Sequence, residues 1–188
     1  MYSQVFVAAL FLHVVSFAIS FGSMIVVDCA GLLWLTGSRG FRLGRVLRVA
    51  DITQPLIWLG FVGLIASGVY MQWEIGKVDT SSIIKFGLVG ALGVNGVVLH
   101  LLKKAFSEFP EEATPHEAKR YIPAMAVATA ISQVGWWGAA IIGFTHAYIR
   151  DAVASPVSPV VSLCLFYGLW IIAAAVSGLY QRKVISAL

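Results

Sequence analysis

One histidine lies inside a long uncharged stretch near the start of the chain, and its side chain is the first that could do chemistry. His13 falls within residues 5–35, which contain no Lys or Arg and a single acid, Asp28. Imidazole can ligate a metal, transfer a proton or form hydrogen bonds. Because ionisable groups are costly inside a bilayer and usually serve a function there, His13 is the leading candidate site residue. A hydrogen-bonded interior histidine is the plainer alternative.

Two further nitrogen ligands are expected at the same depth of the membrane. His146 lies about one turn from the end of the apolar run 124–149, and Lys85 lies near the start of the run 83–102. Given the orientation that the loop charges favour, both fall in the outer leaflet with His13. For Lys85, a side chain that extends to the membrane interface is the plainer interpretation.

Small residues accompany both histidines at helical spacing. Ser16 and Ser20 follow His13 at intervals of three and four, and Gly143 precedes His146 by three residues, so each set shares one helix face. Such stripes allow helices to approach closely, or leave room for a flat cofactor.

Paired imidazoles in an apolar helical bundle favour haem over other metal centres. Haem iron accepts axial nitrogen ligands while the macrocycle fills apolar space, whereas zinc is expected with more Cys, His or carboxylate ligands. The sequence therefore predicts haem b with His13 as an axial iron ligand. His146 is predicted as the second ligand, with Lys85 as its alternative.

A second group of polar side chains is expected toward the cytoplasmic half of the membrane. Its members are Asp28, Asp51, Gln54, Asn95 and His100. The plainer interpretation is interfacial anchoring and hydrogen bonding between helices. The alternative is a binding place for a quinone head group or a second ligand.

The overall composition places these residues in a membrane. Of the 188 residues, 59% are hydrophobic and only 12% are charged, whereas soluble domains carry about 25% charged residues. The net charge of +4 is dispersed over loops, so no nucleic-acid partner is expected. Cys29 and Cys164 lie in apolar runs without a CxxC spacing, which argues against thioredoxin-like chemistry.

Five apolar runs predict an all-α protein with five transmembrane helices in a single domain, because each run approaches or exceeds the roughly 20 residues needed to span a bilayer. They cover residues 5–35, 52–72, 83–102, 124–149 and 160–180. Between the third and fourth runs, Thr114–Arg120 is expected to form a short capped helix. The first run is expected to be retained, because residues 1–4 lack the positive charge that precedes a cleavable signal.

Loop charges predict the orientation. Ten of the thirteen Lys and Arg residues fall on one side of the predicted helices: Arg39, Arg42, Arg45, Arg48, Lys103, Lys104, Lys119, Arg120, Arg182 and Lys183. Cytoplasmic loops carry such an excess. The N-terminus is therefore predicted outside and the C-terminus in the cytoplasm, for a multi-pass protein of the bacterial inner membrane.

Short motifs in the first three runs carry a resemblance to a known family. They are Phe11-Leu12-His13, Gln54-Pro55-Leu56, Ile83-Ile84-Lys85 and the following Lys103-Lys104. Over roughly residues 5–105 the chain resembles the HemJ-type membrane proteins, which are haem-binding protoporphyrinogen oxidases similar to CopD-like membrane domains. In that family a first-helix His and a third-helix Lys are linked to haem binding, which implies these roles for His13 and Lys85.

The chain also departs from this family. It has Asp28-Cys29 where the family has an Arg toward the inner end of the first helix, and it adds a fifth predicted helix and His146. The resemblance therefore implies haem binding without implying porphyrinogen oxidation.

Three functions are consistent with the sequence. The first is a b-type haem protein that acts in electron transfer or as a haem-dependent oxidoreductase, with a quinone or a redox protein as its partner. The second is a small metal or metabolite transporter whose pathway joins the outer histidines to Asp28, Asp51 and His100, although discontinuous helices and mid-membrane acids are not evident. The third is a non-catalytic membrane subunit. Glycine-rich helices are also compatible with a homodimer, and no catalytic residue is predicted.

Overall fold

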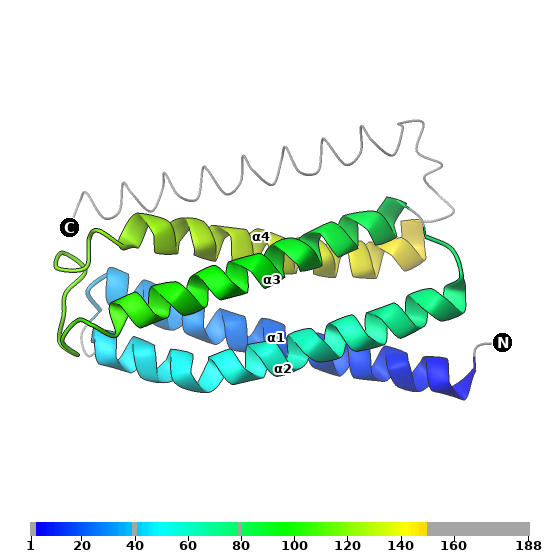
Figure 1. The fold of residues 1–188 in the computed structure, drawn as a ribbon, viewed down its shortest axis with the longest axis horizontal. Coiled ribbons are helices and arrows are strands. Elements are labelled where there is room, and N and C mark those ends of the chain that lie inside the picture. The colour runs from blue at the N-terminus through cyan, green and yellow to red at the C-terminus, as the bar shows by residue number, and fades with distance from the viewer. Residues whose placement is uncertain (1–2, 39–40, 79, 150–188) are drawn as a thin grey trace. The chain divides into compact units, whose positions relative to one another are not determined.

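The structure is a computed structural model that describes residues 3–38, 41–78 and 80–149 of the chain. This described part is all-α and consists of four helices: α1 (Gln4–Leu35), α2 (Leu43–Ile75), α3 (Thr80–Phe106) and α4 (Ile122–Ile149) (Figure 1). All four are long and apolar enough to cross a membrane. The predicted fifth helix, residues 160–180, lies outside the described residues.

Local sequence signals explain where α1 and α2 begin and end. Ser3 caps the start of α1, because its hydroxyl accepts a hydrogen bond from the backbone N–H of Phe6 at 3.1 Å. Gly37, just after α1, and Gly76, at the end of α2, both have a φ of 65°. Glycine adopts this left-handed conformation without the strain that a Cβ would introduce.

Two local predictions differ from the structure. The second helix begins at Leu43, nine residues before the predicted start at 52, because hydropathy detects only the part of a helix suited to the bilayer. Arginine is a good helix former, so Arg45 and Arg48 extend α2 beyond that part. Thr114–Arg120 forms turns and not the predicted short helix. The backbone N–H of Lys119 bonds to the carbonyl of His116, three residues earlier, so a succession of turns replaces helical bonding.

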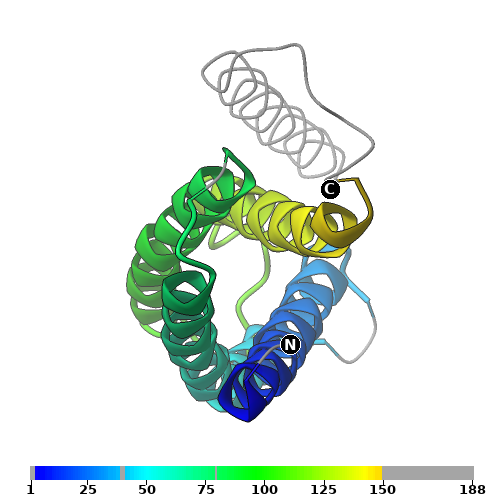
Figure 2. The same cartoon turned by 90° about the vertical axis from the view of Figure 1, so that its right-hand side faces the viewer.

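The helices form two compact units. The first unit contains α1, α2 and the short segment Pro110–Thr114, and the second contains α3 and α4. Within the first unit α1 packs along α2, and within the second α3 packs along α4 (Figures 1 and 2).

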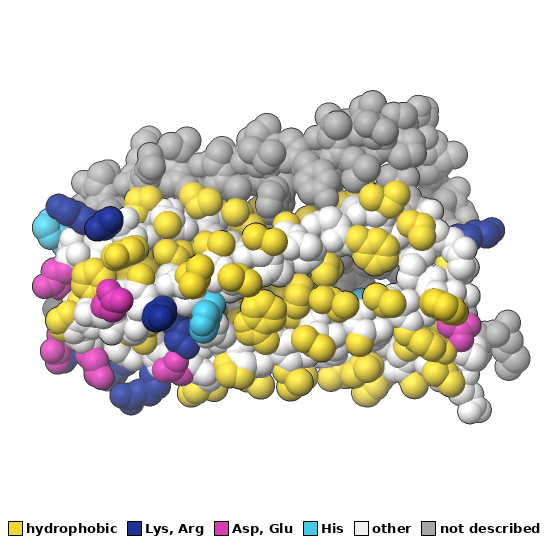
Figure 3. Space-filling model, in the orientation of Figure 1, with side chains coloured by type: hydrophobic (Ala, Val, Ile, Leu, Met, Phe, Trp, Pro, Cys, Tyr) yellow, Lys and Arg dark blue, Asp and Glu magenta, His cyan; other side chains and the backbone are white. Residues whose placement is uncertain are grey.

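Hydrophobic side chains cover the outer faces of the helices. Phe11 on α1 is 71% exposed, and Val94 on α3 is 69% exposed. Figure 3 shows hydrophobic side chains along the middle of α2 and of α3, with charged side chains gathered toward helix ends. Such faces are unfavourable in water and favourable against lipid chains, so the four helices are those of a multi-pass membrane protein.

The contact between α1 and α2 is made by serines on one helix and glycines on the other. Ser16 and Ser20 are buried. A Cβ at Gly60 would lie 2.1 Å from Ser20 Oγ and 2.5 Å from the backbone oxygen of Ser16, and a Cβ at Gly63 would lie 2.3 Å from Ser16 Oγ. The absence of a side chain at these two positions allows the helices to approach this closely.

The segment Pro110–Thr114 is fastened to one end of the α1–α2 pair. The indole N–H of the buried Trp34 donates to the carbonyl of Ala113 at 3.0 Å, and the backbone N–H of Gly44 donates to the carbonyl of Glu111 at 2.9 Å. These bonds connect the chain beyond α3 to the ends of α1 and α2.

Candidate functional site

His13 lies in the contact between α1 and α2. Its side chain is half-buried, and its Nδ1 lies 2.9 Å from Oγ of Ser67 on α2. The ring edge faces Gly68, where an added Cβ would be in ordinary contact at 3.4 Å from His13 Cε1. Ser67 on the neighbouring helix therefore holds the imidazole at Nδ1.

Ser67 is itself fixed by its own helix. The side chain is 3% exposed, and its hydroxyl donates to the carbonyl of Gly63 at 2.6 Å, with the carbonyl of Leu64 at 3.3 Å. Serine commonly bonds in this way to a carbonyl one turn earlier in a helix. The Ser67 oxygen is thereby placed in a definite position toward His13.

Ser16 and Ser20 share the face of α1 that carries His13, as their spacing predicts. Ser20 is completely buried, and its hydroxyl donates to the carbonyl of Ile57 on α2 at 3.2 Å. Ser16 packs at Gly63, as described above. Both hydroxyls therefore lie within the contact between the two helices, which matches the packing interpretation of the serine stripe.

The other predicted ligands belong to the second unit. Lys85 is half-buried near the start of α3, and His146 is in the last turn of α4, with a side chain outside the described residues. Gly143 on α4 is exposed, and an added Cβ there would meet no described atom within 4 Å. The structure thus brings Ser16 and Ser20 to the side of α1 that carries His13. The other predicted residues are Lys85 on α3 and Gly143 and His146 on α4.

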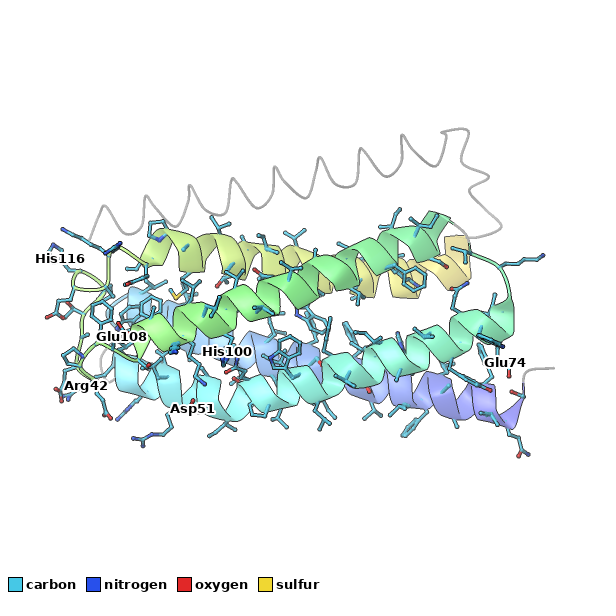
Figure 4. The ribbon with its side chains drawn as sticks, viewed as in Figure 1. Arg42, Asp51, Glu74, His100, Glu108 and His116 are labelled. Atoms are coloured by element: carbon cyan, nitrogen blue, oxygen red, sulfur yellow. The ribbon has the colours of Figure 1, made fainter. Side chains whose placement is uncertain are left out.

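The second polar group is also divided between the units. Asp28, Asp51 and Gln54 are in the first unit, whereas Asn95 and His100 are in the second. Asp51 on α2 and His100 on α3 are exposed (Figure 4). Asn95 is 5% exposed, and its side-chain N–H donates to the carbonyl of Ala128 on α4 at 2.8 Å. The Asn95 side chain therefore does what the plainer interpretation expects, which is to link two helices.

Ser67 is the residue at this site that the sequence-based prediction missed. Gly60, Gly63 and Ser67 follow one another at intervals of three and four along α2, which is the spacing of the serine stripe on α1. Two small-residue stripes on consecutive helices indicate that these faces pack together. That signal could have identified Ser67 as a partner of His13.

Comparisons with known proteins add no relative: no family model, no curated protein and no solved structure matches the chain. The resemblance to the HemJ-type proteins therefore rests on the short motifs quoted above. Among residues 3–38, 41–78 and 80–149, no group of three or more His, Cys, Asp and Glu side chains could hold a metal ion.

Proposed function

We propose that this multi-pass membrane protein binds a b-type haem through His13 and transfers electrons near the outer face of the membrane. The observation that supports this most is the 2.9 Å contact between His13 Nδ1 and Ser67 Oγ. Histidines that ligate metals almost always have their other ring nitrogen in a hydrogen bond, which fixes the ring orientation. The arrangement of His13 on α1 and Ser67 on α2 has this form.

The donor set suits haem because the porphyrin itself supplies the equatorial ligands of the iron. The protein has to add only axial ligands, so His13 can hold the iron from the first unit. Because residue 68 is a glycine, it places no side chain beside the edge of the His13 ring. Lys85 on α3 and His146 on α4 are the two candidates for the second axial position. Bound haem would supply one-electron chemistry, through the ferric and ferrous states of its iron.

The proposal includes a membrane orientation and a partner. Arg42 lies at one end of α2 and Glu74 at the other (Figure 4), and Arg45 and Arg48 are exposed near the end that carries Arg42. This charge distribution supports a cytoplasmic location for that end and an outside N-terminus in a five-helix protein of the bacterial inner membrane. A quinone in the bilayer is the proposed electron partner, and the chain is proposed to form a homodimer.

The first experiment measures the absorption spectrum of the protein purified from cells supplied with haem. A Soret band and reduced α and β bands are expected in the unaltered protein and in His116→Ala, which removes an imidazole from the turns after α3. His13→Ala is expected to lose these bands while eluting as a well-folded species from size-exclusion chromatography. A protein purified without haem under these conditions contradicts the proposal.

The second axial ligand is identified by two matched variants. Lys85→Met and His146→Met each replace a nitrogen ligand with a side chain of weaker affinity for ferric iron. The variant at the true ligand position is expected to change the ferric spectrum, whereas the other is expected to retain the original spectrum. If neither variant changes the spectrum, both candidates are wrong and His13 is the only axial ligand among the three.

A further inference from the structure

We infer that Ser67 holds neutral His13 in the tautomer with its proton on Nδ1, so that Nε2 carries the lone pair that binds iron. The consequence for iron rests on the proposed haem binding, but the tautomer itself follows from the contacts within the α1–α2 pair. This makes Ser67 a positioning residue, because it acts on the iron only through the imidazole.

The short distance from Ser67 to its own helix decides where the hydroxyl proton lies. Oγ of Ser67 and the carbonyl oxygen of Gly63 are 2.6 Å apart. A carbonyl can only accept a hydrogen bond, and two oxygen atoms this close repel unless a proton lies between them. The hydroxyl has one proton, so Ser67 donates to Gly63. The carbonyl oxygen of Leu64 lies 3.3 Å from Ser67 Oγ. It agrees with this assignment, because it too can only accept a hydrogen bond.

The remaining lone pairs of Ser67 then determine the state of His13. Nδ1 lies 2.9 Å from Ser67 Oγ, which is the distance of an N–H···O hydrogen bond. Because Ser67 donates its only hydroxyl proton to the carbonyl of Gly63, Nδ1 of His13 must be the donor to Ser67 and carry a hydrogen. A neutral imidazole has only one N–H, so Nε2 is unprotonated in the neutral ring.

This assignment links packing to ligation. Gly63 lies in the close contact between α1 and α2, and a Cβ there would lie 2.3 Å from Ser16 Oγ. The same glycine supplies the carbonyl that takes the Ser67 proton. The close helix contact therefore sets the position of Gly63 and Ser67, and through them the tautomer of His13.

The test is nitrogen NMR of histidine-labelled protein without haem, because it reads the tautomer independently of iron binding. The His13 signals are assigned by their loss in His13→Gln. In the unaltered protein at a pH where His13 is neutral, the proton is expected on Nδ1, with Nε2 unprotonated. A proton on Nε2 of neutral His13 overturns the inference, and this measurement needs no Ser67 variant to fold.

Variants then test the role of Ser67. Ser67→Ala is expected to shift His13 toward the Nε2–H tautomer and to weaken haem affinity about 10-fold, the lower end of the effect of losing an orienting partner. Ser67→Thr retains the hydroxyl and is expected to keep the Nδ1–H tautomer. Ser23→Ala, which removes a buried hydroxyl elsewhere on α1, is the matched control. It is expected to change neither the His13 tautomer nor the haem affinity. An unchanged tautomer in Ser67→Ala contradicts the assignment.

The two proposals fail in different ways. If neutral His13 carries its proton on Nδ1 but the protein takes up no haem, the haem proposal is wrong and the tautomer assignment stands. If haem binds through His13 but the NMR signals show Nε2–H, the role of Ser67 is wrong and the haem proposal stands.

Discussion

Replacing Gly60 by Ala is the most direct perturbation of the contact that positions His13. The added methyl group would lie 2.1 Å from Ser20 Oγ, 2.5 Å from the backbone oxygen of Ser16 and 3.1 Å from the backbone nitrogen of Ser20. A serine hydroxyl can rotate away, but the backbone of α1 cannot. The helices must therefore separate to accommodate the methyl group.

The expected loss of stability combines two opposing effects. Overpacking a close contact costs about 1–3 kcal/mol, and the upper end applies here because the obstacle is backbone. Alanine in place of glycine favours a helix by up to about 1 kcal/mol. The free energy of unfolding of Gly60→Ala is therefore expected to fall by about 2 kcal/mol.

The assay is unfolding in sodium dodecyl sulfate, followed by circular dichroism, on the full chain in mixed micelles. The matched control is Gly31→Ala on α1, because its added Cβ would meet no described atom within 4 Å. This control retains the helix-favouring effect without the clash, so it is expected to be as stable as the unaltered protein or slightly more stable. A Gly60→Ala protein as stable as Gly31→Ala refutes the close contact between α1 and α2.

Double variants separate side-chain clashes from backbone clashes. At Gly63 the obstruction is Ser16 Oγ at 2.3 Å, followed by Ser16 Cβ at 3.1 Å, so Ser16→Ala is expected to restore most of the stability lost in Gly63→Ala. At Gly60 the backbone oxygen of Ser16 remains after Ser20→Ala, so that pair is expected to stay destabilised. An equal recovery of stability in the Gly63–Ser16 and Gly60–Ser20 double variants contradicts the geometry.

Three further predictions concern other contacts. Trp34→Phe removes the indole donor to Ala113, so it is expected to cost about 1 kcal/mol. It is also expected to speed hydrogen exchange at the bonded N–H groups of Gly44 and Ala113; unchanged exchange contradicts this. Asn95→Ala removes the hydrogen bond to Ala128 and is expected to lower the unfolding free energy by about 0.6–1.7 kcal/mol in the same detergent assay, whereas an unchanged midpoint is the opposing result. Arg42→Gln breaks an ion pair with Glu112 whose side chains are 65% and 74% exposed, so the expected loss is below about 1 kcal/mol; a larger loss contradicts the surface character of the pair.

Hydropathy was sufficient to find the four described helices, because a helix that contacts lipid must be apolar over most of its length. It placed the start of α2 too late because Arg45 and Arg48 lie in helical turns beyond the apolar part. It also gave no information about Pro110–Thr114, whose conformation depends on bonds to Trp34 and Gly44 from distant parts of the chain.

The candidate site was only partly predictable for a related reason. The spacing of His13, Ser16 and Ser20 defines one face of a helix, and the structure places that face against α2. Which atom of α2 meets the imidazole depends on the register between the two helices. Gly60 and Gly63 set that register by allowing close approach, and Ser67 then falls opposite His13.

The central claim is that His13 provides an axial nitrogen to haem iron, and a haem titration of the purified apoprotein in lipid nanodiscs tests it most directly. Affinity is measured from the Soret band for the unaltered chain, His13→Ala and the control His116→Ala. Saturable binding at one haem per chain is expected in the unaltered protein and in His116→Ala, with loss of the ligated spectrum in His13→Ala. The same affinity and the same spectrum in all three proteins would contradict the claim.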